Sequence, residues 1–293
     1  MNNRLRKRTL ETKEIIKRYE DGESTTEIAR LASVSPRYIR MLLKDNNVEM
    51  RPRGSWKRKY TLNEDYFKTW SNNMAYILGF FIADGTIARD LQFVSLSQKE
   101  EYILDDIKRE LGSNHPIYKN KKTGVYILNL NSQIIKKDLI EIHGVKPNKS
   151  STIEFPYVPR EYMSHFIRGY FDGDGFVKYE KYFVSFVGGS KSFMKSLRME
   201  IESNGFETNY TEHNTHFRVY ISGRKTIKLF SDWMYKNKGL YLKRKYEAFQ
   251  KETLPLNQLK DRGIKTHKNA ILKRNQDRIN VKGQKSMYNK LKV

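Results

Sequence analysis

The chain has 293 residues, with 56 Lys+Arg against 33 Asp+Glu and a formal net charge of +23. The absence of cysteine excludes disulfide bonds, Cys-ligated metal centres and cysteine nucleophiles. No apolar run approaches the roughly 20 residues of a membrane helix, and the start MNNRLRKR lacks the apolar stretch of a secretory signal. With 38% hydrophobic and 13% aromatic residues, we expect a folded, cytoplasmic protein of about two domains.

The positive charge is concentrated at the two ends of the chain. Residues 1–60 carry 16 basic and 8 acidic side chains, and residues 251–293 carry 12 basic and 3 acidic ones. The residues between them are closer to balance. Such terminal surpluses favour a polyanionic partner, most often nucleic acid, although solubility alone also explains Lys-rich ends.

Residues 1–50 are expected to form a helix-turn-helix domain. Within 25–44 (TTEIARLASVSPRYIRMLLK), small and apolar residues follow the spacing of two helices packed across a turn: Ala29, Val34, Ile39 and Leu42. Ser35 is a natural N-cap and Pro36 a natural first residue for the second helix. Ser33 occupies the turn position where glycine is usual, which makes a left-handed backbone there slightly costlier.

The second of these helices and the segment after it offer candidate DNA contacts. Three side chains on the helix face outward and could reach phosphates or base edges in a major groove: Arg37, Tyr38 and Arg40. Residues 51–73 are expected to form a basic linker, and an extended arm at its start could enter a minor groove through Arg51 and Arg53. A solvated helical hairpin followed by a plain linker is the alternative interpretation.

The middle of the chain repeats itself at an offset of 90 residues. Three positions of the first copy recur in the second: Gly79, Asp84 and Gly85 become Gly169, Asp174 and Gly175. The apolar positions of a following helix recur too: Ile103, Ile107 and Leu111 become Phe193, Leu197 and Ile201. Alternating apolar and polar residues predict half-buried strands at 91–97, 125–131, 182–188 and 216–222. We therefore expect two halves, 74–160 and 161–250, followed by a basic extension, 251–293.

Each half begins with an apolar helix that ends in an Asp-Gly pair, AYILGFFIADG at 75–85 and HFIRGYFDGDG at 165–175. A glycine in mid-helix costs about 1 kcal/mol relative to alanine and is tolerated where two backbones must touch. We expect Gly79 and Gly169 to pack against each other and place Asp84 beside Asp174. The glycines that follow are expected to leave each helix in a left-handed cap. Two adjacent carboxylates at helix C-termini are unfavourable, and Mg²⁺ would relieve their repulsion.

The two motifs resemble the paired signature of the LAGLIDADG homing endonucleases, and the repeat that contains them covers 74–250. The resemblance implies an α+β fold of two pseudo-twofold related αββαββα halves, whose sheets form a saddle over DNA. It assigns metal binding and catalysis to the second acidic position of each motif, Asp84 and Asp174. At the first acidic position the chain has Ile82 and Asp172; Asp174 is preferred as the ligand because it alone matches Asp84 in the repeat.

The resemblance also implies one basic residue in each half near the reacting phosphate. The segments after the last helix of each half are GVKPNKS at 144–150 and YLKRKYEAF at 241–249. We assign the role to Lys149 and Lys245, where a lysine could stabilise charge on the phosphate or polarise the attacking water. Lys146 and Lys243 are close competitors, and ordinary surface lysines are the alternative.

The resemblance implies a monomeric, site-specific endonuclease that cuts double-stranded DNA at a long asymmetric target with Mg²⁺ and leaves 3′ overhangs. In a prokaryotic or phage-infected cell it would be associated with the nucleoid. Two alternatives use the same scaffold: a non-enzymatic transcription regulator, and an RNA maturase for a group I intron. Retention of Asp84 and Asp174 favours the enzyme, because regulators of this type typically lose the acidic pair.

Overall fold

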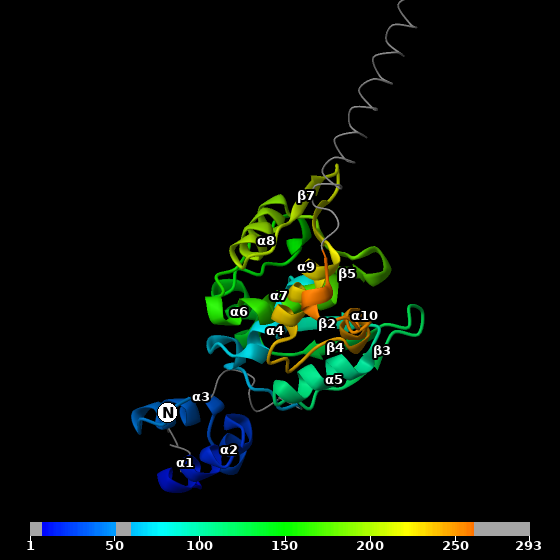
Figure 1. The fold of residues 1–293 in the computed structure, drawn as a ribbon. Coiled ribbons are helices and arrows are strands. Elements are labelled where there is room, and N and C mark those ends of the chain that lie inside the picture. Colours follow the sequence, from blue (N-terminus) through cyan, green and yellow to red (C-terminus); the bar gives the residue numbers. More distant parts are fainter. Residues whose placement is uncertain (1–7, 51–59, 261–293) are drawn as a thin grey trace, which may run out of the picture. The chain divides into compact units, whose positions relative to one another are not determined.

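The computed structural model describes residues 8–50 and 60–260, and the chain divides into two compact units between Thr61 and Leu62 (Figure 1). Each unit has its own hydrophobic core. Within the described ranges, no helix has the length and apolar character needed to cross a membrane.

The first unit contains three short helices, α1 (Thr12–Glu20), α2 (Thr25–Leu31) and α3 (Pro36–Asp45). The Ser24 side chain caps α2 in a capping box with Glu27, and the Ser35 hydroxyl caps α3 by accepting from the Tyr38 amide. Ser33 lies in the turn with φ of 56°, the left-handed conformation expected at that position. The positions predicted to join the two helices are buried together, with Val34 packed against them: Ala29, Ile39 and Leu42.

The second unit consists of two halves with the same order of elements. The first half contains α4 (Asn72–Asp84), β1 (Gly85–Ile87), β2 (Val94–Gln98), α5 (Glu101–Glu110), β3 (Ile117–Lys119), β4 (Tyr126–Leu130) and α6 (Gln133–Glu141). The second contains α7 (Met163–Asp174), β5 (Gly175–Lys178), β6 (Phe183–Gly188), α8 (Lys191–Ser203), β7 (Asn209–Glu212), β8 (Phe217–Ser222) and α9 (Arg224–Tyr235). A further helix, α10 (Lys243–Phe249), follows. The predicted α+β class and the αββαββα order of each half are confirmed.

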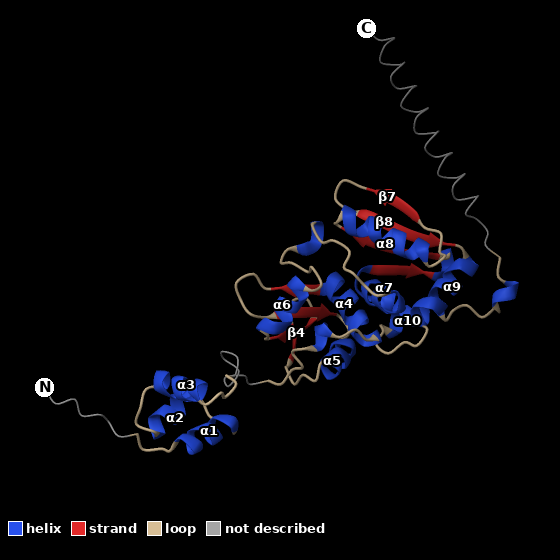
Figure 2. Cartoon of the chain, turned by 90° about the vertical axis from the view of Figure 1, so that its left-hand side faces the viewer, coloured by secondary structure: helices blue, strands red, loops and turns tan. Residues whose placement is uncertain are grey.

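Each half contributes one antiparallel four-stranded sheet, with strand orders β1-β2-β4-β3 and β5-β6-β8-β7. The register preserves the repeat, since Gly85 pairs with Leu96 and Gly175 with Phe186, each 90 residues later. Helix α5 packs on the first sheet and α8 on the second, and their predicted apolar positions are buried. Helices α4 and α7 lie side by side between the halves (Figure 2), so a single core runs through both.

The second unit begins earlier and continues later than the sequence predicted. Phe67, in the 3-10 turn Tyr66–Lys68, is buried, and the Asn63 amide donates to the Leu111 carbonyl at 2.9 Å. Residues 62–73 thus pack on the core, and the predicted linker 51–73 is too long. At the other end, Leu259 is buried, so residues 251–260 of the predicted extension also belong to this unit. The remainder, 261–293, lies outside the described residues.

Candidate active site and nucleic-acid interface

Helices α4 and α7 cross at the two glycines singled out in the sequence. A Cβ atom added to Gly79 would lie 2.1 Å from the Phe166 carbonyl oxygen, and one added to Gly169 would lie 1.9 Å from that of Tyr76. Each glycine therefore touches the backbone of the opposite helix, at positions that correspond in the repeat. This close crossing brings the two helix C-termini together, as predicted.

The glycines that end these helices have another role than the one expected. Gly85 and Gly175 are extended, with φ of −85° and −81°, and not left-handed. A Cβ at Gly85 would lie 2.5 Å from the Phe81 ring, and one at Gly175 would lie 2.1 Å from the Phe171 ring. The prediction of left-handed caps is therefore wrong. Glycine is needed at both positions because a Cβ atom would collide with the aromatic ring. The chain passes directly from each helix into the first strand of a sheet.

Asp84 and Asp174 are the last residues of α4 and α7; Asp84 is half-buried and Asp174 is exposed. A Cβ added to Gly173 would lie 3.4 Å from the Asp84 carboxyl carbon, so the two helix ends are in contact around the carboxylates. Burial, followed by repulsion from Asp174, raises the pKa of Asp84 to about 6. Burial also raises the pKa of Asp174. The repeat thus places one carboxylate of each half in a shared site where the ionised form of each is disfavoured.

Lys149 and Lys245 both lie at this site. The Lys149 Nζ donates to the Gly85 carbonyl, and the Lys245 Nζ donates to the Gly175 carbonyl at 2.6 Å, at the corresponding position of the other half. Burial lowers the pKa of both lysines, to about 8 for Lys245. The nearest competitors in the sequence, Lys146 and Lys243, have exposed side chains.

Asp172 lies away from the carboxylate pair, in the packed interface between the halves. Its side chain has no exposed surface and accepts hydrogen bonds from the Tyr76 hydroxyl at 2.9 Å and the Leu242 amide at 2.7 Å. Burial raises its pKa to about 6. Through these two hydrogen bonds Asp172 connects α7 to α4 and to the segment before α10. This structural role agrees with the choice of Asp174 as the candidate ligand.

Gln98 is a member of this site that the sequence did not reveal. It ends β2, is buried, and its amide Nε2 donates to an Asp84 carboxylate oxygen at 3.0 Å. The repeat gives no signal for it, because the residue 90 positions later is Gly188. Asp174 instead faces a cavity of about 80 Å³ beside Gly188. The one available signal is its place directly after the strand predicted at 91–97, close to the end of the first motif helix.

The donor set at the helix ends is suited to a hydrated divalent cation. The raised pKa of each carboxylate means that its negative charge is unfavourable in the site, and a cation relieves this as well as a proton does. Among residues 8–50 and 60–260, no third acidic or histidine side chain completes a closed metal cluster. Mg²⁺ retains several water ligands and commonly uses one or two carboxylates, so the pair fits this ion.

The first unit presents its candidate DNA contacts on α3. Arg37, Tyr38 and Arg40 are all exposed, in the first turn and a half of the helix that a helix-turn-helix would place in a major groove. Arg51 and Arg53 lie outside the described residues. Their predicted role stays a prediction.

Comparison with known proteins identifies the central region. A family model described as a LAGLIDADG-like domain matches residues 71–144 and 161–232, so the chain contains a LAGLIDADG-like domain, and the resemblance seen in the two motifs is confirmed at that level. These segments contain α4 and α7 with Asp84 and Asp174.

Several curated relatives match parts of the chain. A probable translation initiation factor IF-2 from Methanocaldococcus jannaschii is 26% identical over 191 residues, which cover 60% of this chain and 16% of that protein. A probable cell division protein WhiA from Clostridium botulinum is 29% identical over 111 residues, 36% of this chain and 35% of that protein. The matches therefore span well under two thirds of these relatives.

Solved structures resemble this one at low identity. Full-length DUF199/WhiA from Thermatoga maritima has a TM-score of 0.43 and 15% identity, over 74% of this chain and 72% of that one. The structure of I-DmoI in complex with DNA and Mn has a TM-score of 0.41 and 16% identity, over 60% of this chain and 100% of that one.

Proposed function

We propose that the protein is a site-specific DNA endonuclease of the homing type, which hydrolyses one phosphodiester in each strand of a long asymmetric target. The observation that carries this proposal is the pair of carboxylates, Asp84 and Asp174, held together at the ends of two crossed helices. Each half supplies one carboxylate, and a duplex offers one phosphodiester on each strand. Because one chain contains both halves, a monomer is sufficient.

Each side chain at the site would have a different role in hydrolysis. Asp84 and Asp174 would hold Mg²⁺, which when bound supplies Lewis-acid activation of the phosphate and of water. With its pKa at about 6, Asp84 is mostly ionised above neutral pH and ready to accept the cation. The two lysines place positive charge near the carboxylates, which favours the ionised form that binds a cation. Gln98 fixes one oxygen of Asp84 and leaves the other available.

Affinity for DNA would come from elements outside the carboxylate site. Arg37, Tyr38 and Arg40 on α3 would extend the contact beyond the cut site, and the two sheets would bind the duplex around it. The net charge of +23 supports a polyanionic partner and a location on DNA in the nucleoid.

A non-catalytic DNA-binding regulator is the second candidate, favoured by the similarity to a probable cell division protein WhiA. The carboxylate pair argues against it, since placing the two carboxylates close together raises the pKa of Asp84 and is costly, and a protein that only binds DNA gains nothing from them. An RNA maturase remains the third use of the scaffold.

Selection of cleaved DNA tests the proposal. The protein is incubated with a randomised double-stranded DNA pool and Mg²⁺, and the new ends are captured and sequenced, with EDTA in place of Mg²⁺ as the control. We expect one long asymmetric site, cut on both strands with staggered 3′ ends, only with Mg²⁺. Enrichment of a bound site without any cutting would support the regulator, and selective binding of structured RNA would support the maturase.

A further inference from the structure

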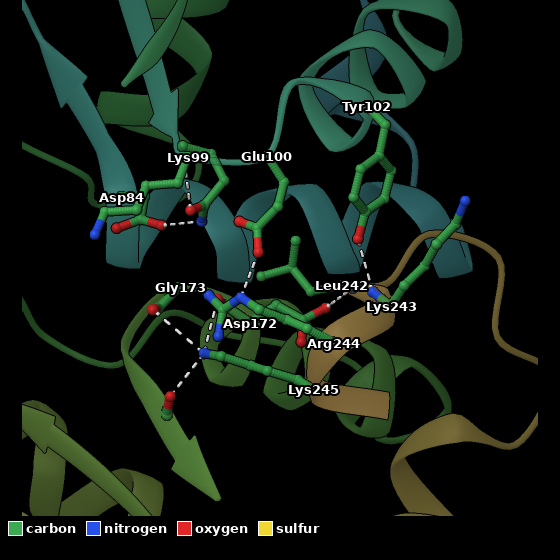
Figure 3. A network of polar contacts seen from close by, with 12 residues as sticks. Asp84, Lys99, Glu100, Tyr102, Asp172, Gly173, Leu242, Lys243, Arg244 and Lys245 are labelled. Atoms are coloured by element: carbon green, nitrogen blue, oxygen red, sulfur yellow. Dashed lines mark hydrogen bonds and ion pairs between the residues drawn. The ribbon is translucent and has the colours of Figure 1, made fainter. Parts of the chain in front are cut away.

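The Lys245 ammonium is fully engaged by backbone carbonyls. Its Nζ lies 2.5 Å from the Phe171 oxygen and 2.6 Å from that of Gly175. The Asp172 oxygen lies at 2.8 Å and the Gly173 oxygen at 3.4 Å (Figure 3). An ammonium group has three hydrogens to donate. The three short contacts use them all, so none is left for a phosphate or a water molecule. The side chain is also 4% exposed, out of reach of a bound substrate.

The segment Leu242–Lys245, here called the α10 clasp, contacts both halves of the unit. Toward α7, the Leu242 amide donates to the buried Asp172 carboxylate at 2.7 Å, and Lys245 holds the last carbonyls of the helix. Toward the first half, the Lys243 amide donates to the Tyr102 hydroxyl at 2.7 Å. The Arg244 guanidinium forms an ion pair with Glu100 (Figure 3). The clasp thus ties the turn that carries Asp174 to the start of α5.

Lys149 occupies the corresponding place in the first half with far fewer contacts. Its Nζ donates to one carbonyl, that of Gly85, which leaves two hydrogens of the ammonium free. It lies on a short 3-10 turn, Lys149–Ser151, and lines the cavity of about 80 Å³ that Asp174 also lines. The cavity has room for water next to both groups. Position 82 holds isoleucine where the second half has Asp172. The first half therefore has no carboxylate at this position to accept hydrogen bonds from the segment that carries Lys149.

We propose that the two lysines have different roles, with Lys245 acting as a positioning residue that fixes the C-terminal turn of α7 and Lys149 as the one lysine able to contact the reacting phosphate or water. The positive charge of Lys245 satisfies the carbonyls at the end of α7 and holds the Asp174 backbone at a fixed distance from the α10 clasp. The role of Lys149 rests on the proposed function, whereas the role of Lys245 does not.

Hydrogen exchange and thermal unfolding of the full chain without DNA test the positioning role. Lys245→Met removes the three short hydrogen bonds to the carbonyls around the end of α7, so we expect Tm to fall by about 5 °C or more. We also expect faster exchange of amides in 173–177 and 242–249. Lys149→Met removes one hydrogen bond at a wetter site and is expected to leave Tm and both segments unchanged. Equal effects of the two variants, or none from Lys245→Met, would overturn the proposal.

Glu252→Gln separates a local effect from general destabilisation. Glu252 bonds Arg224 and Tyr179, away from the α10 clasp, so this variant is expected to lower Tm with no selective increase in exchange at 173–177. If Glu252→Gln accelerates exchange at 173–177 as much as Lys245→Met does, the effect of Lys245→Met is general destabilisation and the proposal is wrong.

Single-turnover cleavage of the selected target tests the role of Lys149. Lys149→Met is expected to lower the cleavage rate by roughly 100-fold or more, with unchanged Tm and unchanged DNA binding in Ca²⁺. Undiminished cleavage by Lys149→Met would refute its role. If the wild-type protein cuts no DNA, the proposed nuclease function fails, and the exchange experiment still decides the role of Lys245.

Discussion

Glu252 shows how a single side chain holds the end of the second unit in place. Its carboxylate accepts two hydrogen bonds from Arg224, at 2.7 and 2.8 Å, and a further one from the Leu254 amide at 3.0 Å. The hydrogen bonds from Arg224 lower the pKa of Glu252 to about 2. Residues 250–260 are therefore secured by an ionic contact as well as by the burial of Leu259.

This contact gives stability a defined dependence on pH. Because the pKa of Glu252 is lower in the folded than in the unfolded chain, its stabilising contribution is complete above about pH 4.5 and is lost as the pH falls toward 2. Glu252→Gln should lower the free energy of unfolding by about 1.5–3 kcal/mol at pH 7. Chemical denaturation at pH 7 and pH 3 measures it. A difference between wild type and variant that is as large at pH 3 as at pH 7 would contradict the assignment.

Among the candidate site residues, those that the repeat carries could be predicted from the sequence. Asp84 and Asp174 share an offset of 90 residues and an identical local context, and the structure brings them together. Gln98 could not be found in this way, because its counterpart is Gly188. The hydrogen bonds of Lys245 to three backbone carbonyls could not be predicted from the sequence either. They depend on the path of the backbone around Gly175 and on the position of α10.

At the scale of elements, the crossing of α4 and α7 should tolerate no added atom. The Cβ of Gly79→Ala would meet the Phe166 carbonyl, a backbone atom that cannot move without separating the helices. We expect a loss of about 3 kcal/mol or more in the free energy of unfolding. Gly124→Ala is the control, because nothing lies within 4 Å of its Cβ and only its φ of 70° makes alanine costly, by about 1 kcal/mol. Similar losses for both variants would mean that the helices do not pack this closely.

Helix α3 should contribute to DNA affinity through charge. Arg40→Ala is expected to weaken binding to the selected target and to reduce the slope of log K against log salt by about 1 if the side chain contacts a phosphate. Lys13→Ala, an exposed basic residue on α1, is the matched control and should leave both quantities unchanged. Titration by fluorescence anisotropy at several salt concentrations provides the measurement. Equal slopes for wild type and Arg40→Ala would place α3 away from the phosphates.

The long periodic elements could be predicted from the sequence and the short ones could not. The four alternating stretches correspond to β2, β4, β6 and β8, the central strands of the two sheets. The outer strands β1 and β3 have three residues each, too few for an alternating pattern. The C-terminal end of the predicted linker belongs to the second unit, because Phe67 and Trp70 are aromatic residues that pack on its core.

For the whole molecule, the boundary at Thr61 predicts that the second unit folds alone. A chain of residues 62–293 contains the entire second core, including Phe67 and the α10 clasp. We expect one cooperative unfolding transition and Mg²⁺-dependent cutting of the same site, with weaker target affinity because α3 is absent. Circular dichroism and cleavage assays test this. A truncated chain that fails to fold would show that the first unit is needed for the stability of the second.

The most direct test of the account compares binding and cutting in the double variant Asp84→Asn, Asp174→Asn. Asparagine keeps the size and removes the charge that holds the cation, and the repulsion between the carboxylates disappears, so the fold should be as stable or slightly more stable. The measurement is cleavage of a plasmid carrying the selected site in Mg²⁺, alongside a gel shift of the same site in Ca²⁺. We predict that the double variant binds the site as the wild type does and that its cutting falls by orders of magnitude, whereas Asp172→Asn keeps more activity than Asp174→Asn. Double-strand cutting by the double variant at the wild-type rate would contradict the assignment of the two carboxylates and the mechanism built on them.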